Sequence, residues 1–113
     1  MIAVIFELEP AEGQENAYHQ AAALKDLVAE AEGFISVERF QSLTTPGKLL
    51  SLSFWENEAA VAQWRQRAAH RRAQGKGRTG VFAGYRLRVA QVLRDYGMED
   101  RDGAPQDSRT AHG

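Results

Sequence analysis

Four side chains between residues 64 and 71 have the chemistry that a small-molecule site requires: Trp64, Arg67, His70 and Arg71. On an ideal helix, with about 100° per residue, both arginines fall on the same side as Trp64. A buried guanidinium needs a partner, so two arrangements are open. Either the helix bends near Ala68 and leaves the arginines in solvent, or they line a pocket and face an anionic group of a ligand.

The chemistry of His70 also has two interpretations. It is either a partly exposed helical histidine among arginines, or a general base or axial metal ligand, because neutral imidazole can do both near pH 7. The neighbouring positive charges favour that neutral form. The chain has no cysteine and no cluster with the spacing of metal ligands, so the sequence predicts no metal site beyond an axial His70.

The composition is that of one ordinary globular domain. The chain has 113 residues, of which 43% are hydrophobic and 26% charged. It has no run of 18 or more apolar residues, so we expect no membrane-spanning helix. The first ten residues lack a basic leader and soon become acidic, and we therefore expect a cytoplasmic protein.

The charges are segregated along the chain. Residues 59–94 hold nine bases and no acid, whereas the net charge of the whole chain is −1. This basic block is either a solvated helix surface, or an anion-binding face or a set of charges paired within or between chains. No nucleic-acid-binding motif accompanies it, so we do not expect a nucleic-acid partner.

Hydropathy patterns predict the order of the elements. Period-two alternation predicts strands over residues 2–8, 34–43, 49–55 and 85–96, although a helix competes for the second half of the last one. A stripe of apolar residues predicts a helix over 12–32, and a second helix begins after Asn57 and weakens near Gly75. The order βαββαβ is that of an α+β, ferredoxin-like fold with a four-stranded antiparallel sheet and two helices on one face.

Such a domain leaves one face of its sheet uncovered. We expect residues 1–98 to form the domain and 99–113 to be a polar, disordered C-terminal tail. Ile35, Val37 and Trp55 are the residues that we expect on the uncovered face. A homodimer that pairs two sheets face to face would cover them.

The stretch LLSLSFWENEAAVAQWRQRAAHRRAQGKGR, followed by FAGYRLRVAQVLRDYGM, resembles the antibiotic biosynthesis monooxygenase family over about residues 2–98. The resemblance implies a homodimeric α+β barrel with a pocket between the sheet and the helices of each subunit. Some members oxidise aromatic polyketides without a cofactor, and others bind and degrade haem. Trp64 matches the tryptophan that shapes the pocket, but Gln74 stands where haem degraders have their proximal histidine, and the first strand lacks their asparagine.

We therefore expect a monooxygenase that acts on a small, largely apolar or aromatic substrate, in secondary metabolism, without a required cofactor. His70 would be the base, Arg67 and Arg71 would stabilise the substrate anion, and Trp64 would line the pocket. Phe40, Phe54, Phe82 and Tyr85 would contact the substrate. One alternative is a haem protein of the same fold with His70 on the iron. The other is a non-catalytic binding or stress-response module whose pocket is filled by Trp64, Phe54 and Phe40.

Overall fold

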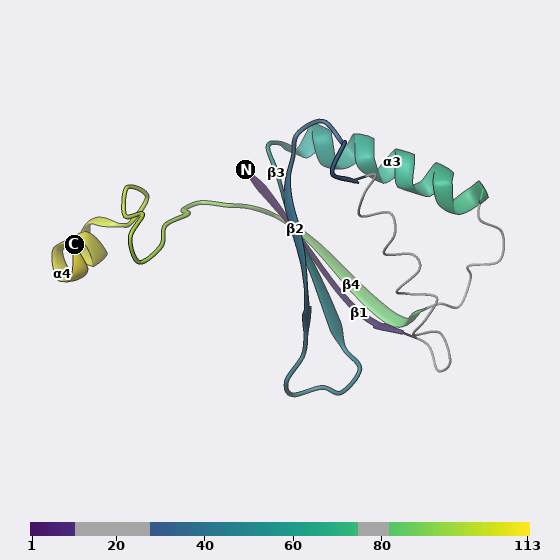
Figure 1. Cartoon of the computed structure of the whole chain (residues 1–113), viewed down its shortest axis with the longest axis horizontal. Coiled ribbons are helices and arrows are strands. Elements are labelled where there is room, and N and C mark those ends of the chain that lie inside the picture. The colour runs from purple at the N-terminus through teal and green to yellow at the C-terminus, as the bar shows by residue number, and fades with distance from the viewer. Residues whose placement is uncertain (11–27, 75–81) are drawn as a thin grey trace.

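The computed structural model describes residues 1–10, 28–74 and 82–113 of the chain. Their helices and strands follow in the order β1 (Ile2–Pro10), β2 (Phe34–Gln41), β3 (Leu49–Trp55), α3 (Glu58–Gln74), β4 (Phe82–Gln91) and α4 (Gln106–His112). Figure 1 shows α3 lying across one face of the sheet, whereas α4 lies apart from the sheet at the C-terminal end. None of the described helices is long and apolar enough to cross a membrane.

The four strands form one antiparallel sheet in the order β2-β3-β1-β4. Strand β1 lies between β3 and β4, so both of its edges are paired with a neighbouring strand. Its aliphatic, partly β-branched residues suit this central position. The order confirms the predicted α+β, ferredoxin-like class. Most of the predicted helix over residues 12–32 lies outside the described residues. At its described end Val28 is helical and buried, whereas residues 29–32 form turns and bends, so the helix ends before residue 32.

The last strand differs from the prediction at both ends. Strand β4 begins at Phe82 and ends at Gln91, not at residues 85 and 96, and no helix replaces its second half. The cause is its partner: Gln91 pairs with Ile2, and the N–H of Val92 donates to the carbonyl of Met1 at 3.0 Å. The pairing of the two strands thus ends at Ile2 and Gln91, and β4 ends with it.

The hairpin between β2 and β3 is confirmed. The N–H of Ser42 donates to the carbonyl of Lys48 at 2.9 Å, so the turn closes at Ser42 and β2 ends at Gln41 rather than residue 43. The Ser42 hydroxyl accepts hydrogen bonds from the backbone of Thr44 and Thr45, and Gly47 adopts a φ of 80° that favours glycine.

The buried core lies between the sheet and α3, and it corrects the predicted position of two residues. Trp55 is only 2% exposed, and Val37 packs against the same cluster, so both lie on the helix-covered face rather than the open one. Ile35, by contrast, is 49% exposed at an irregularity where the register of β2 shifts. The shift decides which residues of β2 face the helix, and alternation alone could not reveal it. The buried cluster consists of Ile2, Val28, Trp55, Ala60 and Val61.

The start of α3 is fixed by two local features. The Asn57 side chain accepts a hydrogen bond from the N–H of Ala60 at 2.9 Å, which confirms the predicted N-cap. Before β2, Gly33 has a φ of 81°, and a Cβ built on it would lie 2.6 Å from the Cβ of Ala60. The chain can therefore approach α3 here only because residue 33 has no side chain.

The C-terminal segment is organised around one arginine. The Arg101 guanidinium donates to the carbonyls of Gly97 and Gly113 and to the Ser108 hydroxyl, and it lies 5.2 Å from the centre of the Tyr96 ring. Helix α4 thus lies within residues 99–113, the segment that the sequence predicts to be a polar tail. The domain boundary near residue 98 stays a prediction.

Candidate active site

Two tryptophans form one end of the surface beneath α3. The rings of Trp55, from β3, and Trp64, from α3, have centres 6.5 Å apart at an angle of 32°. Phe34 packs edge-on against Trp55 at 5.4 Å, and the indole N–H of Trp55 donates to the Ser53 hydroxyl at 2.9 Å. Trp55 is therefore held in place, whereas Trp64 is only partly buried.

Beyond the tryptophans, strand register defines a helix-facing surface. Residues paired across antiparallel strands point to the same side of the sheet, so the side on which Trp55 lies can be followed from strand to strand. Two cross-sheet rows lie on it, in strand order: Val37–Ser53–Val4–Val89 and Arg39–Ser51–Phe6–Leu87.

These rows are mostly apolar, but they are not fully covered. Val4 and Phe6 are partly buried, while Leu87 is 51% exposed. Tyr85 continues this surface beside Leu87, with its ring centre 5.7 Å from that of Phe6. On the side of the sheet that carries α3, the described residues thus form a mostly apolar surface, with two hydroxyls, those of Ser51 and Ser53, near its middle.

The structure places some of the predicted site residues on this surface. Trp64 packs at its edge, and Tyr85 lies at its far end with 69% of its surface exposed. Arg67 of α3 is exposed. The side chains of His70, Arg71 and Phe82 lie outside the described residues.

Phe40 and Phe54 lie elsewhere. Phe54 pairs with Ala3 and Phe40 with Leu50, positions that alternate with the Trp55 side of the sheet. Both phenylalanines are therefore on the open face, away from α3, and the structure does not bring them together with Trp64. Their predicted contact with a substrate beneath α3, and their role in filling that pocket, do not fit this placement.

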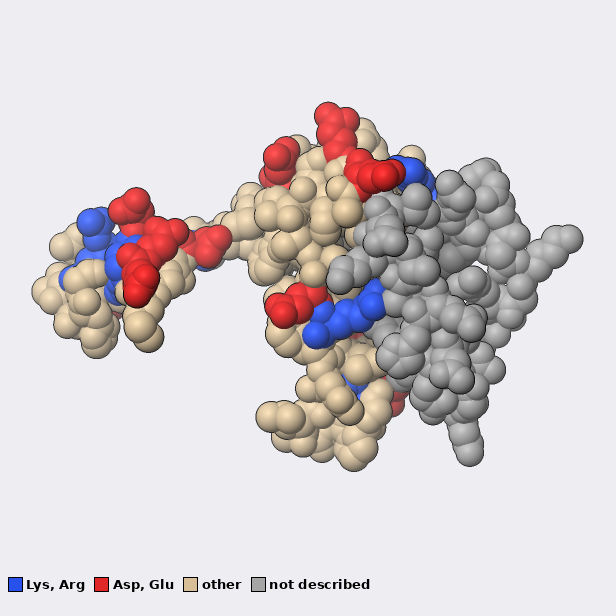
Figure 2. Space-filling view, viewed as in Figure 1, with Lys and Arg blue, Asp and Glu red and all other residues tan. Residues whose placement is uncertain are grey.

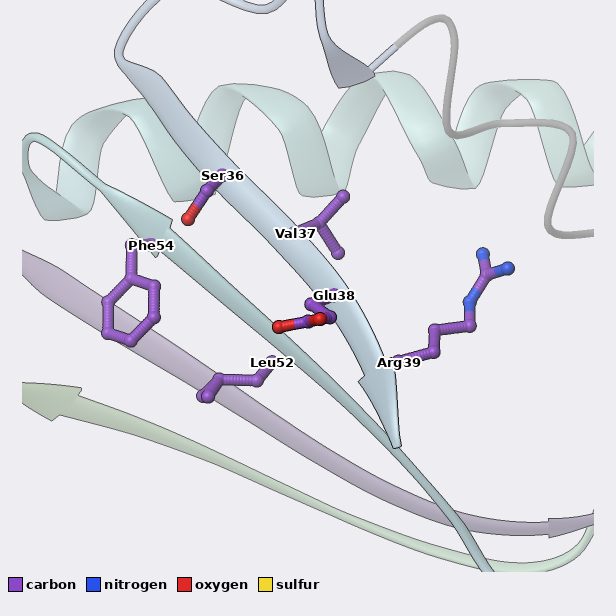
Figure 3. Close-up of a pocket in the computed structure, with 6 residues that line it drawn as sticks. All are labelled: Ser36, Val37, Glu38, Arg39, Leu52 and Phe54. Carbon is purple, nitrogen blue, oxygen red and sulfur yellow. The ribbon is translucent and has the colours of Figure 1, made fainter. Parts of the chain in front are cut away.

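A hollow of about 430 Å³ lies at the β2–β3 edge. Figure 3 shows Val37 and Arg39 on the side of β2 that faces α3, and Leu52 and Phe54 on the other side of the sheet. Of its lining residues, the sequence singled out only Phe54 as a candidate substrate contact. The missed signal is the polar run on β2, because an edge strand that carries charged residues can form the wall of a pocket. The lining consists of Ser36, Val37, Glu38, Arg39, Leu52 and Phe54.

The open face carries a charge cluster centred on Glu7. Its carboxylate accepts a hydrogen bond from Arg88 at 2.6 Å and lies 3.4 Å from the Lys48 ammonium. The Arg88 hydrogen bond, helped by the Lys48 charge, holds the pKa of Glu7 below its ordinary value of 4.5. One member of the basic block is thus paired within the chain, and Figure 2 shows acidic and basic groups side by side on the visible described surface.

The side chains that the structure describes do not gather into a metal-ion site. Among them no three histidine, aspartate or glutamate side chains converge to hold an ion, and the histidine whose side chain is described, His112, is exposed in α4. Histidine is one of the residues that hold haem iron, and the helix-facing surface described above carries no histidine among its described side chains. The ligand that the sequence predicts is His70, whose side chain is not described.

Comparisons with known proteins agree on one family. The family model described as "Antibiotic biosynthesis monooxygenase" matches residues 1–76. Jasmonate monooxygenase ABM of Pyricularia oryzae is 42% identical over 120 residues, which include all of this chain but only 56% of that protein. The uncharacterized protein YqjZ of Bacillus subtilis is 32% identical over 92 residues, covering 81% of this chain and 79% of YqjZ.

A solved structure supports the fold. MhuD of Mycobacterium tuberculosis, a haem degrader solved with two haems bound in its active site, superposes with a TM-score of 0.67 at 19% identity. The match covers 86% of this chain and all of that one. At this identity the likeness concerns the fold alone.

Proposed function

The chain belongs to the antibiotic biosynthesis monooxygenase family, and from this premise we propose that it oxidises a small, largely apolar substrate bound on the helix-facing surface. The observation that carries the proposal is the mostly apolar helix-facing surface. Phe6, Leu87 and Tyr85 are left partly or largely exposed on it, and Trp64, which is only partly buried, packs at its edge. Apolar surface of this kind, next to a few polar groups, is typical of a small-molecule site.

The proposed chemistry starts from an electron-rich substrate. A base removes a proton from an acidic C–H or a phenol, and the resulting anion passes one electron to dioxygen. Recombination at a methylene carbon and loss of water leave a carbonyl group, so that one oxygen atom enters the product and the other leaves as water. This conversion of CH₂ and O₂ to C=O and H₂O balances without another reductant.

The side chains that would serve this reaction are those predicted from the sequence. His70 would accept the proton, and Arg67 or Arg71 would stabilise the anion. Trp64, Tyr85 and Phe82 would pack against the substrate. Replacement of His70 with alanine is expected to reduce turnover by about 100-fold or more, as is usual for removal of a general base; unchanged turnover would remove His70 from the mechanism.

The named relative suggests which substrate to test first. Jasmonate is a small, mostly apolar carboxylic acid, and a protein 42% identical to this chain bears the name jasmonate monooxygenase. The chain spans about half the length of that relative, and we propose that jasmonate is a substrate of this chain as well. We extend the proposal to a homodimer joined through the open face, where Leu50, Leu52 and Phe54 are partly exposed, and to a cytoplasmic location.

The test is product formation under oxygen-18 gas. The purified protein is incubated with jasmonate, and separately with an anthrone, without any added cofactor, with an added reductant and after loading with haemin. The proposal predicts a product that carries one oxygen-18 atom without haemin. Activity only after haemin loading would favour the haem alternative, and saturable binding of both compounds without any product would favour a non-catalytic binding module.

A further inference from the structure

One cross-sheet row on the helix-facing surface changes in polarity from end to end. It runs from Arg39 on β2 through Ser51 on β3 and Phe6 on β1 to Leu87 on β4. Neighbouring strands lie about 4.8 Å apart, so the row spans about 14 Å. A guanidinium and a hydroxyl thus lie at one end, and an aromatic ring and an aliphatic chain at the other.

The cation in this row is distinctive among the strands. Of the arginines on the described strands, Arg86 and Arg88 alternate with Leu87 and lie on the open face, where Arg88 pairs with Glu7. Arg39 alone lies on the helix-facing surface, two residues after Val37, which packs against the core. Figure 3 shows the Arg39 side chain on the same side of β2 as Val37.

The hydroxyl of Ser51 lies beside it in the same row. Ser53, in the neighbouring row, already accepts the indole N–H of Trp55. The hydroxyl of Ser51, which pairs with Arg39, has no hydrogen-bond partner among the residues that the structure describes, and Ser51 is only partly exposed. A guanidinium has five N–H donors, so Arg39 can engage a further oxygen whatever else it contacts.

We infer that Arg39 and Ser51 form an anchor for the carboxylate of an amphipathic substrate, whose apolar body lies across Phe6 toward Leu87. This inference rests on the proposed function and adds the substrate class and orientation to it. A carboxylate accepts two parallel hydrogen bonds from a guanidinium, and a serine hydroxyl can donate a third. A substrate held in this way would present its apolar end to the part of the sheet near Tyr85.

The experiment compares binding of a charged ligand with that of its neutral ester. Jasmonate and methyl jasmonate, and octanoate and methyl octanoate, are titrated into the full chain and into Arg39→Gln, Arg39→Lys and Ser51→Ala. Arg94→Gln, which removes an exposed arginine beyond the end of β4, is the control for net charge. Circular dichroism and thermal unfolding confirm that each variant is folded.

The anchor predicts that Arg39→Gln weakens binding of the acids by about 10-fold to 100-fold, as expected for loss of a charged hydrogen bond. The esters should bind equally well to the full chain and to Arg39→Gln. Arg39→Lys should recover part of the affinity for the acids, Ser51→Ala should weaken it several-fold, and Arg94→Gln should leave it unchanged. An equal loss for acids and esters, or no loss for either, would overturn the anchor.

The outcomes separate the anchor from the proposed function. Charge-dependent binding through Arg39 without any oxygenated product would sustain the anchor and remove the monooxygenase activity on these acids. Turnover of jasmonate that is indifferent to Arg39→Gln would sustain the activity and overturn the anchor. Failure of the full chain to bind any of the four probes would also overturn the anchor.

Discussion

Trp55 and Trp64, the two tryptophans of the chain, meet across the boundary between sheet and helix with their ring centres 6.5 Å apart. They have different environments, because Trp55 is 2% exposed and hydrogen-bonded to Ser53, whereas Trp64 is partly buried. We therefore assign them different roles. Trp55 stabilises the packing of α3 on the sheet, and Trp64 extends that packing to the surface where we place the substrate.

This division predicts unequal effects on stability. Trp55→Ala should lower the free energy of unfolding by about 3–5 kcal/mol, the usual range for a buried aromatic side chain. Trp64→Ala should cost less, because part of its ring is already exposed. Urea denaturation followed by circular dichroism at one fixed protein concentration measures both values. If Trp64→Ala costs as much as Trp55→Ala, the division of roles is wrong.

Gly33 and Gly47 provide a second, matched test. Both have a φ near 80°, but a Cβ at Gly33 would lie 2.6 Å from the Cβ of Ala60, whereas a Cβ at Gly47 would contact nothing within 4 Å. Gly47→Ala should therefore cost only the backbone strain, about 1 kcal/mol. Gly33→Ala should cost about 1–3 kcal/mol more, because the loop and α3 must move apart. Equal losses in urea denaturation would show that the close approach to Ala60 is unimportant.

The charge cluster on the open face predicts a pH dependence. The pKa of Glu7 is lowered in the folded state, so its ion pairs stabilise the fold above the unfolded pKa, and this contribution is lost as the pH falls through the folded pKa. Glu7→Gln should flatten the acid limb of a plot of stability against pH. Glu9→Gln, a change of an exposed carboxylate on the same strand, is the control. Identical acid limbs for wild type and Glu7→Gln would exclude a role for the cluster.

The open face also predicts the oligomeric state. Leu52 lies on this face opposite Ile5, so Leu52→Glu places a charge where two sheets would meet. Sedimentation velocity should show a dimer for the wild type and a monomer for Leu52→Glu. Leu43→Glu, at a fully exposed position of the turn between β2 and β3, should leave the dimer intact. A monomeric wild type at micromolar concentration would contradict the dimer.

Much of the fold could be predicted because local patterns determine it. The alternation of Ile2, Val4, Phe6 and Leu8 identifies β1. Asn57, placed directly before the helical segment, caps α3 as predicted. The end of β4 could not be predicted, because it depends on where β1 begins, which is a property of the pair. The prediction that Trp55 and Val37 lie on the open face was wrong for a related reason. Both faces of β3 carry apolar residues, and an irregularity shifts the register of β2.

The candidate site was predictable only in part. Trp64 stands out by its residue type and its place on the apolar stripe of α3, and the structure places it against the core. Arg39 has no such signal, because its importance comes from the pairing of β2 with β3, which puts it beside Ser51. Phe40 and Phe54 show the converse, since their aromatic character suggested a substrate contact but the strand register places them on the open face.

The most direct test of the account is to locate a bound ligand by NMR. The two indole N–H signals, together with the methyl signals of Val37 and Leu87 on one face and Leu50 and Leu52 on the other, report separately on the two sides of the sheet. During titration with jasmonate, the account predicts shifts of the Trp64 indole and of the Val37 and Leu87 methyl groups, with the Leu50 and Leu52 signals unchanged. Shifts confined to Leu50 and Leu52 would contradict it, because the ligand would then lie on the open face.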